Sequence, residues 1–117
     1  LTVGYTDNLV RVWEPATGKV RWTLSGHRES VYSLAFSPDG QTLASSSHDQ
    51  TVILWNMASG QLRHVLTGHQ GRVQSVAFHP EGAELVSCGD DGSLRIWSAK
   101  TGQCVRTIAA SNGQLFA

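Results

Sequence analysis

The sequence repeats itself with a fixed period of 42 residues. The stretch from Gly26 to Trp55 returns almost in register as the stretch from Gly68 to Trp97. Its second half also stands at the amino terminus, where it ends at Trp13. A repeat of roughly 40–45 residues that ends in tryptophan, with Gly-His upstream, is typical of a propeller blade and not of a helical solenoid. The period therefore predicts an all-β fold of antiparallel, four-stranded β-propeller blades.

Short apolar runs bounded by turn residues fill each period, as expected for a β-meander. The segment 37–40 is one such turn, because proline presets φ and glycine is free to take a positive φ. Residues 31–36 are apolar on both faces, which predicts an innermost strand packed between neighbouring blades. The predicted strands cover residues 1–5, 9–13, 19–24, 31–36, 42–47, 52–56, 61–66, 73–78, 84–88, 94–97 and 104–108.

The repeat also predicts how the chain is organised. Residues 1–24 supply the last three strands of a blade, 25–66 and 67–108 are complete blades, and 109–117 form a loop and the beginning of the next inner strand. Propellers close with about 4–8 blades, so we expect residues 1–117 to be an incomplete ring from a larger protein. Such an arc leaves open edges and apolar blade faces, through which the chain could form homo-oligomers.

Charge and cysteine content exclude several classes of function. Nine basic residues balance nine acidic ones, so the basic excess that nucleic-acid binding needs is missing. No apolar run approaches the length of a membrane span. Cys88 and Cys104 fall on the second and fourth predicted strands of one blade, roughly 10 Å apart, which is too far for a disulfide. Free thiols predict a reducing, cytoplasmic location. Neither CxxC nor HxxxH occurs, so we expect no metal site.

Several motifs of the first complete unit together resemble the WD-repeat β-propeller family: Gly26-His27, Ser37-Pro38-Asp39-Gly40, Leu43-Ala44-Ser45-Ser46-Ser47, and Val52-Ile53-Leu54-Trp55. The resemblance covers nearly the whole chain, and the repetition makes it specific. The signature dipeptide is degenerate, because tryptophan is followed by Glu14, Asn56 and Ser98 and never by aspartate.

The resemblance implies a hydrogen-bonded tetrad that ties the loop between blades to the second and third strands. By residue-for-residue match, the structural tetrads are His27, Ser45, Asp49 and Trp55, and again His69, Ser87, Asp91 and Trp97. A carboxylate at the turn can accept from imidazole, while serine and the indole N–H share the remaining bonds. The amino-terminal unit has Val3 at the serine position and keeps only Asp7 and Trp13, and Ser111 replaces the histidine in the tail.

Two functional interpretations, a hydrolase triad and a calcium loop, compete with the structural role of these residues. Serine, histidine and aspartate form nucleophilic triads, but here the set occurs twice at identical spacing and without a Gly-x-Ser-x-Gly elbow. The segment 89–92 could suggest a calcium loop, yet the alternating oxygen ligands and the closing glutamate are missing. We therefore expect no catalytic residues and no cofactor, and we expect hairpin turns at these positions.

Partner-binding candidates flank the predicted loops and hairpin turns, which the resemblance places at one end of the central channel. They are Ser30, Tyr32 and His48, matched one period later by Arg72, Gln74 and Asp90. Phe116 stands near the next such loop. Aromatic residues and arginine are frequent interface anchors, and related proteins commonly contact partners at these positions.

These observations predict a non-catalytic protein–protein interaction scaffold that binds a protein or peptide partner on the loop face. Two alternatives stay open. The blades could form the sensor or regulatory propeller of a multidomain ATPase or kinase, or they could self-assemble into a multichain propeller. Fold membership by itself does not decide between these functions.

Overall fold

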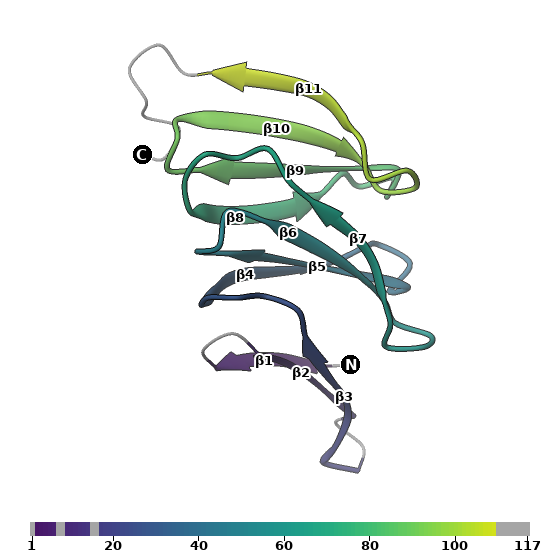
Figure 1. Ribbon diagram of the computed structural model, residues 1–117. Coiled ribbons are helices and arrows are strands. Elements are labelled where there is room, and N and C mark those ends of the chain that lie inside the picture. The colour runs from purple at the N-terminus through teal and green to yellow at the C-terminus, as the bar shows by residue number, and fades with distance from the viewer. Residues whose placement is uncertain (1, 7–8, 15–16, 110–117) are drawn as a thin grey trace.

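The computed structural model describes residues 2–6, 9–14 and 17–109, which form three antiparallel sheets (Figure 1). The first contains β1 (Thr2–Thr6), β2 (Leu9–Glu14) and β3 (Lys19–Ser25). The second contains β4 (Val31–Phe36), β5 (Thr42–Ser47), β6 (Val52–Asn56) and β7 (Leu62–Leu66). The third contains β8 (Val73–Phe78), β9 (Glu84–Gly89), β10 (Ser93–Ser98) and β11 (Cys104–Ala109). No helix among the described residues could span a membrane.

Each sheet is a meander in which strands follow one another in chain order. The second and third sheets each have four strands, so the predicted all-β fold with antiparallel four-stranded blades in an open ring is confirmed. Four strands have the predicted bounds, and the other seven differ by one residue at one or both ends, as at β7, which begins at Leu62. Gly40, at the predicted turn after β4, has φ +73°, which is the freedom that the turn requires.

The sheets pack face to face, and the hydrophobic core lies in the two interfaces between them. On β6, Ile53 and Trp55 point into the interface with the first sheet, whereas Val52 and Leu54 point into the interface with the third. All four side chains are at most 2% exposed. The run Val-Ile-Leu-Trp is therefore apolar at every position because both faces of the middle sheet are covered.

The most deeply buried strand is β5 and not the inner strand β4, which corrects the expectation for residues 31–36. Every residue of β5 is buried, whereas on β4 only Val31 is buried and the other five residues are half-buried. β4 is the edge of its sheet, and β5 lies between β4 and β6 with both faces covered. Three consecutive serines, Ser45, Ser46 and Ser47, tolerate this burial because each hydroxyl has a hydrogen-bond partner.

Neighbouring sheets are also joined where an outer strand meets the last turn of the next sheet. The Trp22 indole on β3 donates to a backbone carbonyl of the second sheet at 3.3 Å and lies over Gly60. His64 on β7 repeats the contact with the third sheet at 3.0 Å, over Gly102. Both glycines have positive φ, +72° and +74°, and a Cβ on either would collide with the ring. These positions therefore require glycine for two independent reasons.

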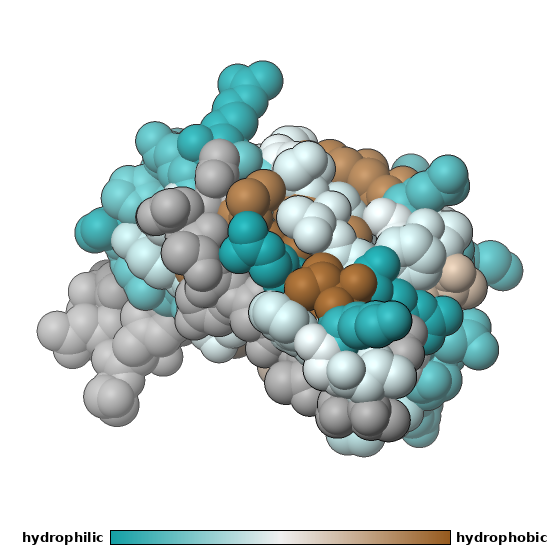
Figure 2. All heavy atoms as spheres, turned by 90° about the horizontal axis from the view of Figure 1, so that it is seen from below, coloured by the Kyte–Doolittle hydropathy of each residue, from teal (hydrophilic) through white to brown (hydrophobic). Residues whose placement is uncertain are grey.

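The outer faces of the arc carry apolar residues without cover from a neighbouring described sheet. Seen from the side of the first sheet, hydrophobic residues gather in separate patches between hydrophilic ones (Figure 2). At the other end, Val86, Leu94 and Ile96 of the third sheet are half-buried and Ile108 is 44% exposed. The arc thus presents partly apolar surface at both ends.

Candidate functional site

A chain of buried side chains crosses the second sheet from its tryptophan to the loop before β4. The Trp55 indole donates to Ser45 Oγ at 2.9 Å, and Ser45 Oγ lies 2.6 Å from His27 Nε2. His27 Nδ1 in turn lies 3.0 Å from Asp49 Oδ2. The structure therefore brings together the four residues that the resemblance implied, within hydrogen-bonding distance of one another.

The electrostatics fix the direction of these bonds. Burial lowers the pKa of His27, so the neutral imidazole is the favoured form. The pKa of Asp49 is lowered too, because hydrogen bonds from Thr51, the Arg28 backbone and His27 outweigh the opposing effect of burial. A carboxylate can only accept, so His27 Nδ1 donates to Asp49 and its Nε2 accepts from the Ser45 hydroxyl. Every polar side-chain atom of this four-residue network is then satisfied.

The third sheet repeats the arrangement. The Trp97 indole donates to Ser87 Oγ at 2.8 Å, and Ser87 Oγ lies 2.7 Å from His69 Nε2. His69 Nδ1 lies 3.2 Å from Asp91 Oδ2. Burial lowers the pKa of His69, and hydrogen bonds from the Gln70 backbone and from Ser93 hold the pKa of Asp91 far below its ordinary value. The same residues at the same spacing therefore give the same network.

Each network has a fifth member that sequence reasoning missed. Thr51 Oγ1 donates to Asp49 Oδ1 at 2.5 Å, and Ser93 Oγ donates to Asp91 Oδ1 at 2.7 Å. Both hydroxyl residues stand two positions after the aspartate, one period apart. That recurrence of a β-hydroxyl residue was the available signal. In each network this hydroxyl donates to one carboxylate oxygen, and the other carboxylate oxygen faces the histidine.

The buried networks do not present a nucleophile to substrate. Ser45 and Ser87 are 0% exposed, and each hydroxyl oxygen is already occupied by an indole N–H. A serine nucleophile must instead reach a substrate carbonyl, with its oxygen free to attack. These serines therefore stabilise the fold in the conformation that the structure describes.

A second network lies at the loop end of the sheets and joins the second blade to the third. The Tyr32 hydroxyl lies 2.9 Å from His48 Nδ1, and His48 Nε2 lies 3.7 Å from a Glu29 carboxylate oxygen. Arg72, from the loop before β8, also forms a hydrogen bond with the Tyr32 side chain, and this bond raises the arginine pKa. We call this set, with Gln74 and Asp90, the loop-face network.

On the third blade the network is closed by a carboxylate with two partners. Arg72 Nε lies 2.7 Å from Asp90 Oδ2, and the Gln74 amide donates to Asp90 Oδ1 at 2.7 Å. The Arg72 and Asp90 side chains are 48% and 32% exposed. Five of the six partner-binding candidates are thus tied together at one end of the molecule while staying accessible to solvent.

The sixth candidate, Ser30, contributes its backbone instead. Its carbonyl accepts from the Ser47 hydroxyl at 2.8 Å and from the His48 backbone N–H at 2.9 Å, so it fixes the loop on which the network rests. The positions Asp7, Ser111 and Phe116 of the sequence analysis lie outside the described residues.

Neither cysteine nor acidic residues build a metal centre in the described part of the chain. No group of three histidine, cysteine, aspartate or glutamate side chains there could hold a metal ion, and Cys88 and Cys104 are both free thiols. The segment 89–92 forms the turn between β9 and β10, where Gly92 has φ +77°. Its counterpart Gln50 has φ +75°, which is unusual for a residue with a side chain.

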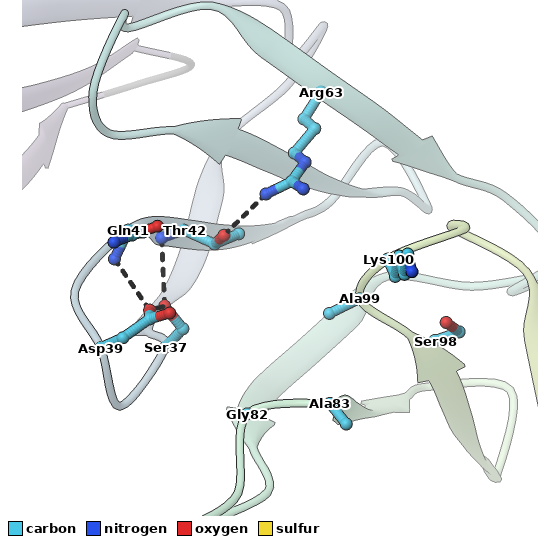
Figure 3. A pocket seen from close by; sticks show the side chains of 10 residues that line it. All are labelled: Ser37, Asp39, Gln41, Thr42, Arg63, Gly82, Ala83, Ser98, Ala99 and Lys100. Atoms are coloured by element: carbon cyan, nitrogen blue, oxygen red, sulfur yellow. Dashed lines mark hydrogen bonds between the residues drawn. The ribbon is translucent and has the colours of Figure 1, made fainter.

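A hollow of about 450 Å³ lies at the opposite end of the sheets, between the second and third blades (Figure 3). Arg63 reaches over it and donates to Thr42 Oγ1 at 3.2 Å. Asp39 accepts from Ser37 Oγ at 2.5 Å and from the Gln41 backbone at 3.0 Å, and these bonds lower its pKa. The hollow is polar and open, and none of the residues predicted as partner contacts lines it.

This geometry, three meandering sheets with two buried Trp-Ser-His-Asp networks, defines a β-propeller of the WD-repeat class. The family model described as WD domain, G-beta repeat, matches residues 18–56 and 60–98, more than half of the chain. The chain therefore belongs to the WD40-repeat family. Proteins of this family generally mediate protein–protein interaction and are generally not enzymes.

Similar proteins match the chain over roughly one repeat each. It is 50% identical over 38 residues to the WD40 repeat-containing protein HOS15 of Arabidopsis thaliana, which is 32% of the chain and 6% of that protein. It is 46% identical over 52 residues to the B-type cell cycle switch protein ccs52B of Medicago truncatula, 44% of the chain and 10% of that protein. For coronin-7 of Mus musculus, the identity is 46% over 43 residues, 37% of the chain and 5% of that protein. The chain thus spans a tenth or less of these curated relatives.

The arrangement of the sheets also matches a solved structure. The structure of U3-55K superposes with a TM-score of 0.85 and 26% sequence identity, and covers 89% of this chain and 34% of that one. The likeness therefore extends beyond single blades to the way neighbouring blades pack.

Proposed function

We propose that the chain is a non-catalytic protein–protein interaction scaffold, whose loop face contacts a protein or peptide partner without a cofactor. The contact residues in this proposal are Ser30, Tyr32, His48, Arg72, Gln74 and Asp90. The loop-face network is the observation that carries it. The full burial of both network serines supports the non-catalytic part.

The loop-face network suits recognition because it is both held in place and accessible. Tyr32 is bonded to His48 within its own blade and to Arg72 of the next blade, so these side chains lose little further freedom when a partner binds. Tyrosine and arginine are also the residue types that most often anchor interfaces. The two free thiols favour a reducing, cytoplasmic setting for such a scaffold.

Selection of peptides from a random displayed library on the immobilised chain tests this proposal. Selected peptides should lose about tenfold or more in affinity for Tyr32→Ala and Arg72→Gln, the loss typical of interface anchors. Arg63→Gln, at the opposite end of the sheets, is the matched control and should bind as the parent does. Equal binding to all four proteins, or no selected peptide at all, would refute the loop face as the contact surface.

Self-assembly is the second candidate, and the open outer faces favour it. Ile108 is 44% exposed beside half-buried Leu94 and Ile96, on the face where a further sheet would pack. A second copy of the chain could cover this face, head to tail. Light scattering after size exclusion should then give a defined multiple of 12.6 kDa. A monomer at all concentrations would exclude assembly.

A further inference from the structure

The cross-strand pair between the third and fourth strands of a blade differs in the middle sheet. At equivalent positions, one period apart, the directly opposed residues are Arg11 and Thr23 in the first sheet, Ile53 and Val65 in the second, and Arg95 and Thr107 in the third. An arginine–threonine pair thus stands on both sides of the one apolar pair. Directly opposed residues share one face of a sheet, so the exchange changes a whole surface patch.

In the third sheet the arginine closes the space between the outer strand and the preceding loop. Arg95 Nη1 donates to Thr107 Oγ1 at 3.3 Å. The same guanidinium lies so close to Gly68 that a Cβ there would be 3.1 Å from Nη1. The Arg95 side chain therefore occupies the space between β11 and the loop that contains Gly68.

In the second sheet the same place is open. A hollow of about 390 Å³ lies there, which we call the rim groove; it is lined by Gly26, Arg28, Asp49, Thr51, Ile53, Val65 and Thr67. Val65 is 46% exposed and the adjoining Leu62 is 47% exposed, whereas Ile53 forms a buried floor at 1%. The groove thus combines an apolar floor with an exposed apolar wall, in the size range of sites for small ligands and side chains.

The loop end of the rim groove carries one cation, the Arg28 guanidinium, beside the hydrogen-bonded carboxylate of Asp49. Within the described residues, the Arg28 guanidinium makes no ion pair and no hydrogen bond, because only its backbone N–H contacts Asp49, at 2.9 Å. The Asp49 carboxylate is meanwhile occupied by His27 and Thr51. An incoming carboxylate would therefore find an available cation beside the apolar wall.

The long side of the groove is the outer edge of the second sheet. β7 pairs with β6 on one side, and no described strand pairs with its other side. An extended peptide can add to such an edge through its backbone, with alternate side chains directed to one face. Beside β7, that face is the one that carries Val65.

We propose that the rim groove binds an extended peptide segment of a partner protein, which seats an aliphatic side chain on Ile53 and Val65 and places an acidic residue at Arg28. This surface is separate from the loop face and would let the scaffold hold a second partner segment.

The test uses the whole chain and the synthetic peptide acetyl-Gly-Asp-Leu-Asp-Gly-amide, followed by NMR of the Ile53 and Val65 methyl groups. The peptide should shift both methyl signals in a saturable way. Replacing its leucine by serine should weaken binding about tenfold, since a buried aliphatic contact is lost. Replacing both of its aspartates by asparagine should weaken binding less, and Arg28→Gln should abolish that difference.

The repeats supply matched variants. Ile53→Arg with Val65→Thr installs the pair of the third sheet and should close the groove, with a loss of about tenfold or more in affinity. Because this variant lacks both methyl probes, its binding is followed on the backbone amide signals of Gly26 and Thr67, which also line the groove. Arg95→Ile with Thr107→Val should open a second site in the third sheet. Val65→Thr alone changes an exposed residue, folds as the parent does, and should still weaken binding severalfold. Tyr32→Phe on the loop face should leave binding unchanged.

Three results would overturn the proposal. The methyl signals could stay unshifted up to millimolar peptide, or the serine peptide could shift them equally. They could also move with protein concentration in the absence of peptide, which would make a second copy of the chain the occupant.

Discussion

Removing the Ser45 hydroxyl should lower the free energy of unfolding by more than the loss of one small group suggests, because two partners depend on it. In Ser45→Ala, the Trp55 indole N–H loses its acceptor and His27 Nε2 loses its donor, both in a site where the serine is 0% exposed. A buried polar group left unpaired costs about 1–3 kcal/mol. Two such groups predict a decrease of about 2–6 kcal/mol in the free energy of unfolding.

The neighbouring residue is the control, because Ser46 is also 0% exposed and lies on the same strand. Its hydroxyl makes only a 3.5 Å contact with a backbone carbonyl, so Ser46→Ala should cost less than about 1 kcal/mol. Urea unfolding measures both, and with a slope of about 2 kcal/mol per M, Ser45→Ala should lower the midpoint by about 1–3 M without changing the slope. Ser87→Ala should behave like Ser45→Ala. Equal losses for Ser45→Ala and Ser46→Ala would refute the network as the source of the stability.

Three further predictions concern other parts of the fold. Burial lowers the pKa of both network histidines, so the unfolded chain binds more protons than the folded chain below about pH 6.5. The free energy of unfolding should therefore be constant above that pH. Below it, the free energy of unfolding should fall by up to about 1.4 kcal/mol per pH unit for each histidine. Urea midpoints that stay constant or rise from pH 7.5 to pH 5 would contradict this. In thermal unfolding, Gly60→Ala should lower the stability by at least about 2 kcal/mol more than Gly18→Ala does. Both glycines have positive φ, but only Gly60 faces the Trp22 ring. Similar losses for the two variants would show that contact with the ring is not the cause. Gln50→Gly should raise stability by about 0.5–1 kcal/mol, since Gly92 occupies the same turn position with φ +77°, and a loss would show that the Gln50 side chain matters more than its backbone.

The strand layout could be predicted from the sequence because turn residues mark nearly every strand end. Burial could not be predicted in the same way. A run such as Ser45-Ser46-Ser47 has the composition of an exposed strand, yet it is fully buried, since packing between two sheets rewards small side chains whose hydroxyls find partners. Conversely, the apolar β4 is only half-buried, because its place at a sheet edge overrides its composition.

The networks show a similar division. Repetition marked the four residue types of each tetrad, but the roles of Thr51 and Ser93 became visible only from their contacts with the aspartates. The bond between Tyr32 and Arg72 joins two different blades and has no counterpart one period away, so the period could not indicate it. At the rim groove the sequence shows a break in the repeat, because Ile53 stands where the other two units have arginine. That this break leaves an open groove depends on side-chain packing and is visible only in the structure.

The contacts of Trp22 with Gly60 and of His64 with Gly102 run in one direction, from an outer strand to a turn made about forty residues later. During synthesis on the ribosome, each ring therefore emerges before the surface that receives it. The indole of the first sheet stays uncovered until the second sheet has formed its last turn, and the same delay then applies to His64. The packing of each sheet is thus completed only by the sheet that follows it in the chain. Synthesis from the N-terminus therefore leaves one aromatic side chain unpacked at a time, and this favours assembly of the blades in chain order.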